Sequence, residues 1–250
     1  MTRNFVDIDD LTTDELHAVL DRAATIKAAH GDGRADTPLT DQTLGMIFEK
    51  PSTRTRVSFE TGMTQLGGHA IFLGPDDIHL GHQTLADLLT IRERFGFDAS
   101  VAWVGDGNNV CQSFVLGAAM VGLDLTVATP AGYGVDEGVL RRAEGLGSGP
   151  ETTTDPAEAI AGADVVYTDV WVSMGQEDER EQKLREFEGF QLTTDRVGDR
   201  TVMHCLPAHR GEEITDDVLE SDNAIVWNQA ENRMHAQKGL LTWLDENDRE

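Results

Sequence analysis

The chain has 250 residues, 39% of them apolar, which is enough for one large or two smaller globular domains with buried cores. Its formal net charge of -25 argues against nucleic acid as a partner, because such a surface repels phosphate. No apolar run is long enough to span a bilayer, and the first residues, Met1 to Phe5, do not resemble a secretory signal. We therefore expect a cytoplasmic protein that does not engage a membrane.

The acidic residues are spread along the chain rather than gathered in one tail. A dispersed acidic surface keeps a protein soluble in concentrated salt, where screening weakens the repulsion between its charges. The composition therefore favours a salt-loving source, and an ordinary acidic protein is the alternative.

The first part of the chain is predicted to hold a β-α-β unit. An opening helix is indicated by a capping box of Thr12 and Glu15 with an apolar face behind it. A buried strand is predicted at 44–48, followed by a helix that ends at Leu66 and a second strand at 69–73. Two strands joined by a helix predict parallel pairing with a right-handed crossover.

The rest of the chain alternates between short apolar runs and helical patterns. A helix is predicted at 85–95, a surface loop at 145–154 and a final helix at about 229–244. Strands are predicted at 101–104, 125–128, 165–168, 202–204 and 224–226. This alternation predicts an α/β fold with a doubly wound parallel sheet, in which ligands gather beyond the carboxyl ends of the strands.

The segment Ser52-Thr53-Arg54-Thr55-Arg56 lies between a predicted strand and a predicted helix. The free N–H groups and the dipole of a helix N-terminus favour an anion, and Arg54 can hold a phosphate through two parallel hydrogen bonds. A simple N-cap with two surface arginines is the alternative, but the density of donors favours an anion site.

Four segments resemble the aspartate and ornithine carbamoyltransferase family and occur in the order found there. Residues 48–60, Phe-Glu-Lys-Pro-Ser-Thr-Arg-Thr-Arg-Val-Ser-Phe-Glu, resemble the carbamoyl phosphate loop of both branches. Residues 169–175 resemble the amino-acid loop of the ornithine branch, and residues 204–211 resemble its His-Cys-Leu-Pro motif. Residues 231–238 resemble its closing helix.

The resemblance implies two doubly wound parallel-sheet domains, the first one truncated. A shortened carbamoyl phosphate-binding domain is expected at 1–96 and an ornithine-binding domain at 97–228, with a C-terminal helix at 229–250 packing back on the first. The implied reaction converts carbamoyl phosphate and L-ornithine to L-citrulline and phosphate, with no metal and no cofactor. A homo-oligomer, a trimer by resemblance, is expected.

The resemblance also implies roles for individual residues. Catalytic roles fall to Arg54, Cys205 and His82. Carbamoyl phosphate would be bound by Ser52, Thr53, Arg54, Thr55, Gln83, Cys205, Leu206 and Arg233. Ornithine would be bound by Asn109, Asp169, Ser173 and Met174.

Two features permit a structural interpretation as well as a functional one. Cys111 and Cys205 match no zinc-binding spacing, so each is either a buried thiol or a site residue. The segment 105–109, Gly-Asp-Gly-Asn-Asn, resembles a dinucleotide-binding loop but lacks its third glycine, and Asn108 and Asn109 equally fit a turn.

The chain departs from the family pattern just before Gln83. A stretch of roughly forty residues or more, enough for more than one β-α-β unit, is missing there. An arginine that the family uses for carbamoyl phosphate has no counterpart, and His82 directly precedes Gln83 rather than standing three residues before it. The sequence thus leaves two interpretations, an ornithine carbamoyltransferase and a catalytically impaired homologue that binds amino acid or partner subunits without turnover.

Overall fold

A computed structural model describes residues 5–32, 37–47, 52–73, 82–172 and 180–247. The chain divides into two compact units, one formed by residues 1–90 with 231–250 and the other by residues 91–230. The division falls within two helices, α3 (His82–Phe95) and α10 (Val226–Asn247), each of which contributes residues to both units. The expected boundary at 96/97 lies directly after α3.

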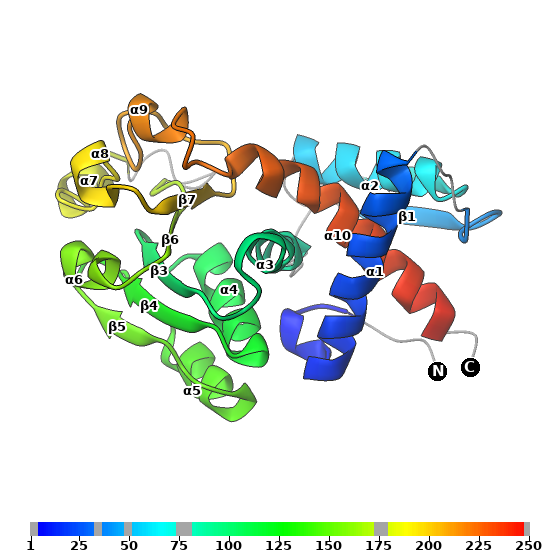
Figure 1. Cartoon of the computed structure of the whole chain (residues 1–250), viewed down its shortest axis with the longest axis horizontal. Helices are drawn as coiled ribbons and strands as arrows, with labels where there is room; N and C mark the ends of the chain where they lie inside the picture. The colour runs from blue at the N-terminus through cyan, green and yellow to red at the C-terminus, as the bar shows by residue number, and fades with distance from the viewer. Residues whose placement is uncertain (1–4, 33–36, 48–51, 74–81, 173–179, 248–250) are drawn as a thin grey trace. The chain divides into compact units, whose positions relative to one another are not determined.

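The first unit surrounds a pair of parallel strands, β1 (Thr43–Ile47) and β2 (His69–Leu73), with Thr43 opposite His69. Its helices are η1 (Ile8–Asp10), α1 (Thr13–Gly31), α2 (Thr53–Gln65) and parts of α3 and α10 (Figure 1). The predicted capping box is confirmed, because Thr12 accepts from the Glu15 N–H while the Glu15 carboxylate accepts from the Thr12 N–H. Gly67 takes a positive φ of 86° in the turn between α2 and β2.

The helices of this unit are tied together by polar contacts from α10. Asn232 accepts a hydrogen bond from Lys27 of α1 at 2.7 Å and donates one to Thr90 of α3 at 2.9 Å. Lys238 hydrogen bonds to Gln65 at the end of α2. The C-terminal helix is therefore an integral part of the unit that holds the N-terminus of the chain.

The two-stranded sheet leaves apolar surface open. A small core of Leu39, Met63 and Leu66 packs beside it, whereas Ile71 in β2 is 44% exposed.

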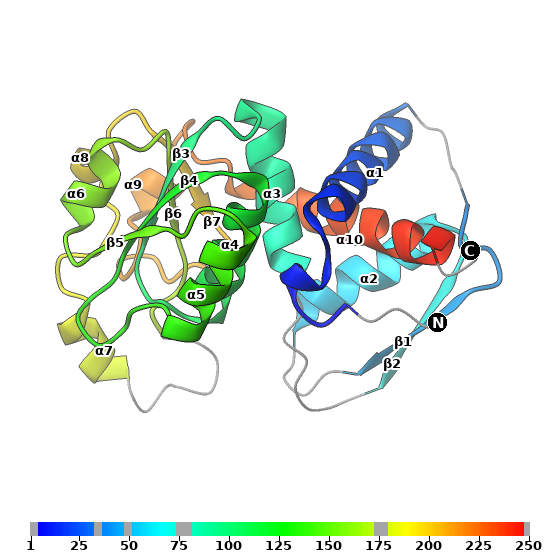
Figure 2. The same ribbon diagram turned by 90° about the horizontal axis from the view of Figure 1, so that it is seen from below.

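The second unit is a doubly wound parallel sheet, as predicted. Its strand order is β5-β4-β3-β6-β7, and all four pairings are parallel. The strands are β3 (Ser100–Val104), β4 (Asp124–Ala128), β5 (Glu151–Thr153), β6 (Val165–Thr168) and β7 (Thr201–His204). The helices are α4 (Asn109–Val121), α5 (Glu137–Leu146), α6 (Pro156–Ala161), α7 (Arg180–Glu186), α8 (Thr194–Val197) and α9 (Asp216–Leu219). Helices flank this sheet on both sides (Figure 2).

The two faces of this sheet are packed differently because successive strand residues point to opposite sides. On one face Trp103 and Tyr167 stack edge-on at 4.7 Å, and Phe114 of α4 meets Tyr167 at 5.2 Å. On the other face Ala102 and Val104 join an apolar cluster that includes residues of α6, α8 and α9 as well as Trp171, Phe187 and Phe190. A sheet buried on both faces is a rigid support for the loops that follow its strands.

Two element predictions were wrong. The apolar run at 224–226 forms no strand; Ala224 makes one isolated bridge to Val202, and α10 begins at Val226. The segment at 145–154 contains the edge strand β5, which pairs with β4. The polar residues of β5 are mostly exposed, so they show none of the apolar alternation from which strands are predicted.

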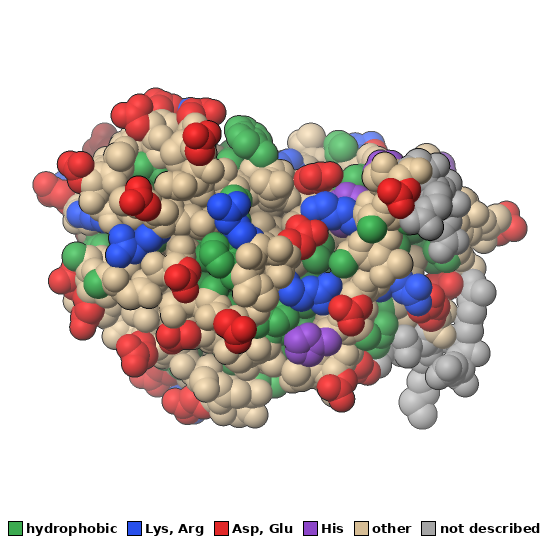
Figure 3. Space-filling model, viewed as in Figure 1, with side chains coloured by type: hydrophobic (Ala, Val, Ile, Leu, Met, Phe, Trp, Pro, Cys, Tyr) green, Lys and Arg blue, Asp and Glu red, His purple; other side chains and the backbone are tan. Residues whose placement is uncertain are grey.

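On the face shown in Figure 3, acidic side chains are scattered with basic ones between them rather than gathered in one patch. With a net charge of -25, their summed repulsion opposes the compact state. Among the described helices, none is long and apolar enough to cross a membrane.

We expect the melting temperature at pH 7.5 to be higher in 2 M KCl than in 0.1 M KCl, because the screening length falls from ~10 Å to a few Å. Differential scanning fluorimetry measures this shift. The gain should shrink at pH 5.5, closer to the sequence pI of about 4.5, where fewer charges repel. An unchanged or lower melting temperature in 2 M KCl would contradict the electrostatic explanation.

Candidate functional site

Three neighbouring strands of the second unit end in residues with reactive or charged side chains. Asp106 follows β3, Asp169 follows β6 and Cys205 follows β7. The strand order places these three strands side by side, so their carboxyl ends share one edge of the sheet. Ligands of open parallel sheets bind at this edge.

Asp169 joins the ends of all three loops. Its Oδ1 accepts a hydrogen bond from the Cys205 thiol at 2.8 Å, and its Oδ2 accepts one from the Asn108 side-chain amide at 2.9 Å. The residue is only 5% exposed. The sequence singled out Asp169 and Cys205, and the structure brings them into direct contact.

Asn108 was treated in the sequence only as a turn residue, and its contact with Asp169 was missed. Its side-chain oxygen caps α4 by accepting from the N–H groups of Val110 and Cys111, both at 3.0 Å. The sequence signal for this role was an asparagine directly before a helix that follows a strand. Asn109, the residue expected to bind ornithine, is the first residue of α4 and is exposed.

The loop after β7 has an unusual backbone. Leu206 takes a positive φ of 54°, which costs an L-residue about 1–3 kcal/mol, and its N–H donates to Nδ1 of His204 at 2.9 Å. Because Nδ1 accepts, the proton of the neutral His204 ring is on Nε2, which donates to Glu213 Oε1 at 2.9 Å. The buried His204–Glu213 pair therefore fixes the loop that carries Cys205 and Leu206.

A buried ion pair lies behind this edge of the sheet. Lys183 Nζ lies 2.6 Å from Asp106 Oδ2 and donates to the carbonyl oxygen of Trp171 at 2.8 Å. Burial raises the pKa of the Asp106 carboxyl above its usual value, and Lys183 opposes that rise. Lys183 thus ties the loop after β3 to the chain that leads toward Ser173 and Met174, two predicted ornithine contacts that lie outside the described residues.

Cys111 is buried in α4 and joins this group of contacts through its backbone N–H, which donates to Asn108. Burial, with smaller contributions from Asp106 and Asp169, raises the pKa of its thiol well above the usual value. Cys111 therefore stays protonated and inert, in line with the structural interpretation of this cysteine.

The first unit carries the predicted anion-binding segment at the N-terminus of α2. Ser52 is the N-cap residue, but its hydroxyl makes no capping bond and donates instead to Thr55 Oγ1 at 2.7 Å. Arg233 of α10 is buried and also donates to Thr55 Oγ1, at 2.8 Å. Thr53 and Arg54 are exposed in the same first turn. The structure thus brings Arg233 to this turn from the far end of the chain.

Gln83 and His82 begin α3 in the same unit. The Gln83 side-chain amide donates to the buried Asp87 carboxylate at 2.6 Å, which fixes its direction. The side chain of His82 lies outside the described residues, so its catalytic role remains a prediction.

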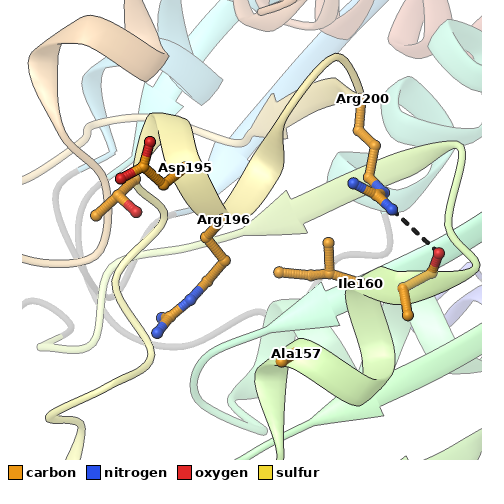
Figure 4. Close-up of a pocket in the computed structure, with 7 residues that line it drawn as sticks. Ala157, Ile160, Asp195, Arg196 and Arg200 are labelled. Atoms are coloured by element: carbon orange, nitrogen blue, oxygen red, sulfur yellow. Dashed lines mark hydrogen bonds between the residues drawn. The ribbon is translucent and has the colours of Figure 1, made fainter.

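A surface pocket of about 450 Å³ lies elsewhere in the second unit, between α6 and α8 (Figure 4). The arginines that line it donate hydrogen bonds to backbone carbonyl oxygens. Arg200 donates to the carbonyl oxygens of Ala161 and Ala163, and Arg196 donates to that of Gln191. This pocket holds none of the predicted site residues.

Comparison with known proteins identifies relatives along the whole chain. The carbamoyl-P binding domain of aspartate/ornithine carbamoyltransferases matches residues 3–121, and the Asp/Orn binding domain of the same family matches residues 98–244. The chain is 55% identical to an ornithine carbamoyltransferase of Haloquadratum walsbyi, over 96% of this chain and 97% of that protein. It is 41% identical to that of Archaeoglobus fulgidus, over 97% of each.

Solved structures give the same result. The ornithine carbamoyltransferase from Pyrococcus furiosus superposes with a TM-score of 0.90 at 39% identity, over 96% of both chains. The enzyme of the same name from Thermus thermophilus gives 0.85 at 34% identity, over 98% of this chain and 99% of that one.

The alignment also reveals a shortfall. It spans 295 positions against the Haloquadratum walsbyi protein, whereas the present chain has 250 residues, so at least 45 positions have no residue here. This shortfall agrees in size with the stretch expected to be missing before Gln83.

Replacing Lys183 by methionine should destabilise the second unit by about 3–5 kcal/mol at pH 8, because Asp106 is left buried and charged. Urea unfolding in molar KCl measures the loss. The loss should shrink at lower pH, since the raised pKa of Asp106 lets the carboxyl become neutral there.

The double variant Lys183→Met/Asp106→Asn is the matched control, because it removes the buried charge as well. It should recover part of the lost stability at pH 8. If the double variant is no more stable than Lys183→Met alone, the ion pair is not the cause.

Proposed function

Since this chain belongs to the aspartate/ornithine carbamoyltransferase family, we propose that it transfers the carbamoyl group of carbamoyl phosphate to the side-chain amine of L-ornithine. The products are L-citrulline and phosphate, so the reaction belongs to arginine metabolism. The choice of ornithine as the substrate rests on one observation. Relatives at 55% identity and below, and the superposed structures, are all named ornithine carbamoyltransferase. These relatives support turnover rather than the alternative of an impaired homologue.

The first turn of α2 holds the phosphate end of carbamoyl phosphate. Ser52, Thr53, Arg54 and Thr55 supply hydroxyl, backbone and guanidinium donors, and Arg233 adds a second positive charge from α10. The contact of Arg233 with Thr55 supports this assignment, because it fixes a buried guanidinium at a helix N-terminus, where an anion is favoured. Gln83, oriented by Asp87, holds the carbamoyl amide.

The carboxyl edge of the second unit's sheet holds ornithine. Asn109, Asp169, Ser173 and Met174 bind its backbone end, and Cys205 and Leu206 lie near the reacting amine and the carbamoyl group. The hydrogen bond between Cys205 and Asp169 supports this arrangement, because it holds the thiol and the carboxylate side by side at this edge of the sheet. The carboxylate offers a counter-charge for a cationic amino acid.

The reaction needs alignment and charge stabilisation rather than a covalent intermediate. The neutral side-chain nitrogen of ornithine attacks the carbamoyl carbon, a C–N bond forms, and negative charge gathers on the carbonyl oxygen. The bond to the phosphate oxygen then breaks, phosphate leaves with the electron pair, and it takes up the proton that the nitrogen loses. Arg54 and the hydroxyl groups of Ser52 and Thr55 stabilise the developing charge.

Ornithine binds mostly as an ammonium ion near neutral pH, so a proton must leave before attack. His82 and Cys205 are the residues we assign to this part of the reaction. The working assembly is a homo-oligomer, a trimer by family resemblance, and the place of action is the cytoplasm.

Arg54→Ala should lower kcat/KM for carbamoyl phosphate by about 100- to 1000-fold, because a donor to the developing charge is removed. Citrulline formation from ornithine and carbamoyl phosphate in 2 M KCl measures the effect. Arg56→Ala is the matched control, since Arg56 lies two residues further along the same helix and pairs with Glu60 at 2.8 Å. The control should keep most of the activity.

Absence of turnover from folded, salt-stable wild-type protein would overturn the proposal and leave the impaired homologue as the better account. Equal loss in both arginine variants would show that general positive charge matters rather than Arg54.

Asp169→Asn should raise KM for ornithine by about 10- to 100-fold, because a charged hydrogen-bond acceptor is lost. KM for carbamoyl phosphate should change less than about twofold, since its proposed site is in the other unit. Asp199→Asn, an exposed aspartate in the turn before β7, is the control and should behave as wild type. A comparable rise in both KM values for Asp169→Asn would contradict the assignment of Asp169 to ornithine.

A further inference from the structure

The turn that follows the Cys205–Leu206 loop gathers three side chains with metal-binding atoms. These are His209, Glu212 and Glu213, and none has a part in the proposed transfer of the carbamoyl group. The turn is tight, because the Glu212 N–H donates to the carbonyl oxygen of His209 at 2.9 Å and the Gly211 N–H donates to that of Ile214 at 2.8 Å. One ligand atom from each of the three side chains lies within 4.8 Å of the other two.

Within the part of the chain that the structure describes, each of these side chains presents a buried atom that has no hydrogen-bond partner. The atoms are Nδ1 of His209, Oε2 of Glu212 and Oε2 of Glu213. His209 Nδ1 lies 3.8 Å from Glu212 Oε2, too far for a hydrogen bond. Three such polar atoms in one place are unusual in a native fold, where almost every buried polar atom is paired.

The other oxygen of each carboxylate is already anchored. Glu213 Oε1 accepts from the His209 N–H at 2.6 Å and from His204 Nε2 at 2.9 Å, and Glu212 Oε1 pairs with Arg180. Glu212 is thereby held with Oε2 3.8 Å from His209 Nδ1, and a carboxylate oxygen of Glu213 lies within 4.8 Å of both neighbouring side chains. This is how outer contacts orient the ligands of a metal site.

The charges around the three side chains also favour a cation. Glu213 is 0% exposed, and its two donors, the His209 N–H and the neutral His204 ring, carry no positive charge. A buried carboxylate held only by neutral donors is costly unless a cation compensates it. Arg180 compensates Glu212, not Glu213.

We propose that His209 Nδ1, Glu212 Oε2 and Glu213 Oε2 bind one divalent first-row transition metal ion such as Zn²⁺ or Co²⁺. One imidazole and two carboxylates suit these ions. Ligands about 2.1 Å from a tetrahedral ion lie about 3.4 Å apart, so a small rotation of His209 closes the site. The His209 side chain is 42% exposed and is free to make that rotation.

The ion would act on the structure of the turn rather than on the reaction. Through Glu213 and His204 it would hold the loop that carries Cys205 and Leu206. The proposal therefore stands on the described contacts of the turn and does not depend on which amino acid the protein carbamoylates.

Titration of the intact protein with Co²⁺ in 2 M KCl tests the site through visible absorption. We expect one ion per chain, with d–d bands and no intense thiolate-to-cobalt band in the near ultraviolet, because all three ligands are nitrogen or oxygen. Zn²⁺ should displace Co²⁺ and raise the melting temperature. His209→Ala and Glu212→Gln should each weaken Co²⁺ binding at least tenfold.

The matched controls are His69→Ala and Glu181→Gln, which remove an exposed histidine and an exposed carboxylate next to Arg180. Both should bind Co²⁺ as the wild type does. Circular dichroism establishes whether every variant is folded. If His209→Ala does not fold, the conservative variant Glu212→Gln carries the test.

Two results would overturn the proposal. The first is no saturable Co²⁺ binding up to millimolar concentration, or binding that survives both His209→Ala and Glu212→Gln. The second is a thiolate-to-cobalt band that disappears in Cys205→Ser, which would place the ion on Asp169, His204 and Cys205 instead.

Discussion

The carboxylate of Asp169 is the constraint on which the second unit's binding edge depends. It lies at the end of β6, the strand between β3 and β7. One of its oxygens accepts a hydrogen bond from the loop after β7, and the other accepts one from the loop after β3. One buried charge thereby sets the positions of a helix cap and of a thiol at once. A neutral side chain of the same shape would fill the space but could not accept both hydrogen bonds equally.

The surrounding contacts extend this arrangement outward. The His204–Glu213 pair fixes the loop after β7, and Lys183 joins Asp106 to the Trp171 carbonyl. All of these groups are buried and most are charged or strongly polar. Burying these polar groups costs free energy, and the packing of aromatic and aliphatic side chains on the two faces of the sheet offsets that cost.

Much of this was predictable from the sequence, and the reasons differ between residues. The apolar runs at 69–73 and 165–168 predicted β2 and β6 to the residue. The residues of β6 are all buried, and strands buried on both faces of a parallel sheet are continuous in apolar character. Asp169 and Cys205 were found because they stand in segments that resemble known ones. The edge strand β5 was missed, since its polar residues carry no periodic signal. The partnership of Lys183 with Asp106 was also missed, because residues 77 positions apart give no local pattern.

The first unit is built from both ends of the chain, and this affects the order in which the two units can fold during synthesis. The unit that begins the chain is completed only by residues 231–250, through the contacts of Asn232, Arg233 and Lys238 with α1, α2 and α3. The unit formed by residues 91–230 is continuous and can close first, although it is made second. Newly made α1 and α2 must therefore wait, with apolar surface uncovered, for more than a hundred further residues, which takes roughly ten seconds or more at a synthesis rate of about 5–20 residues per second.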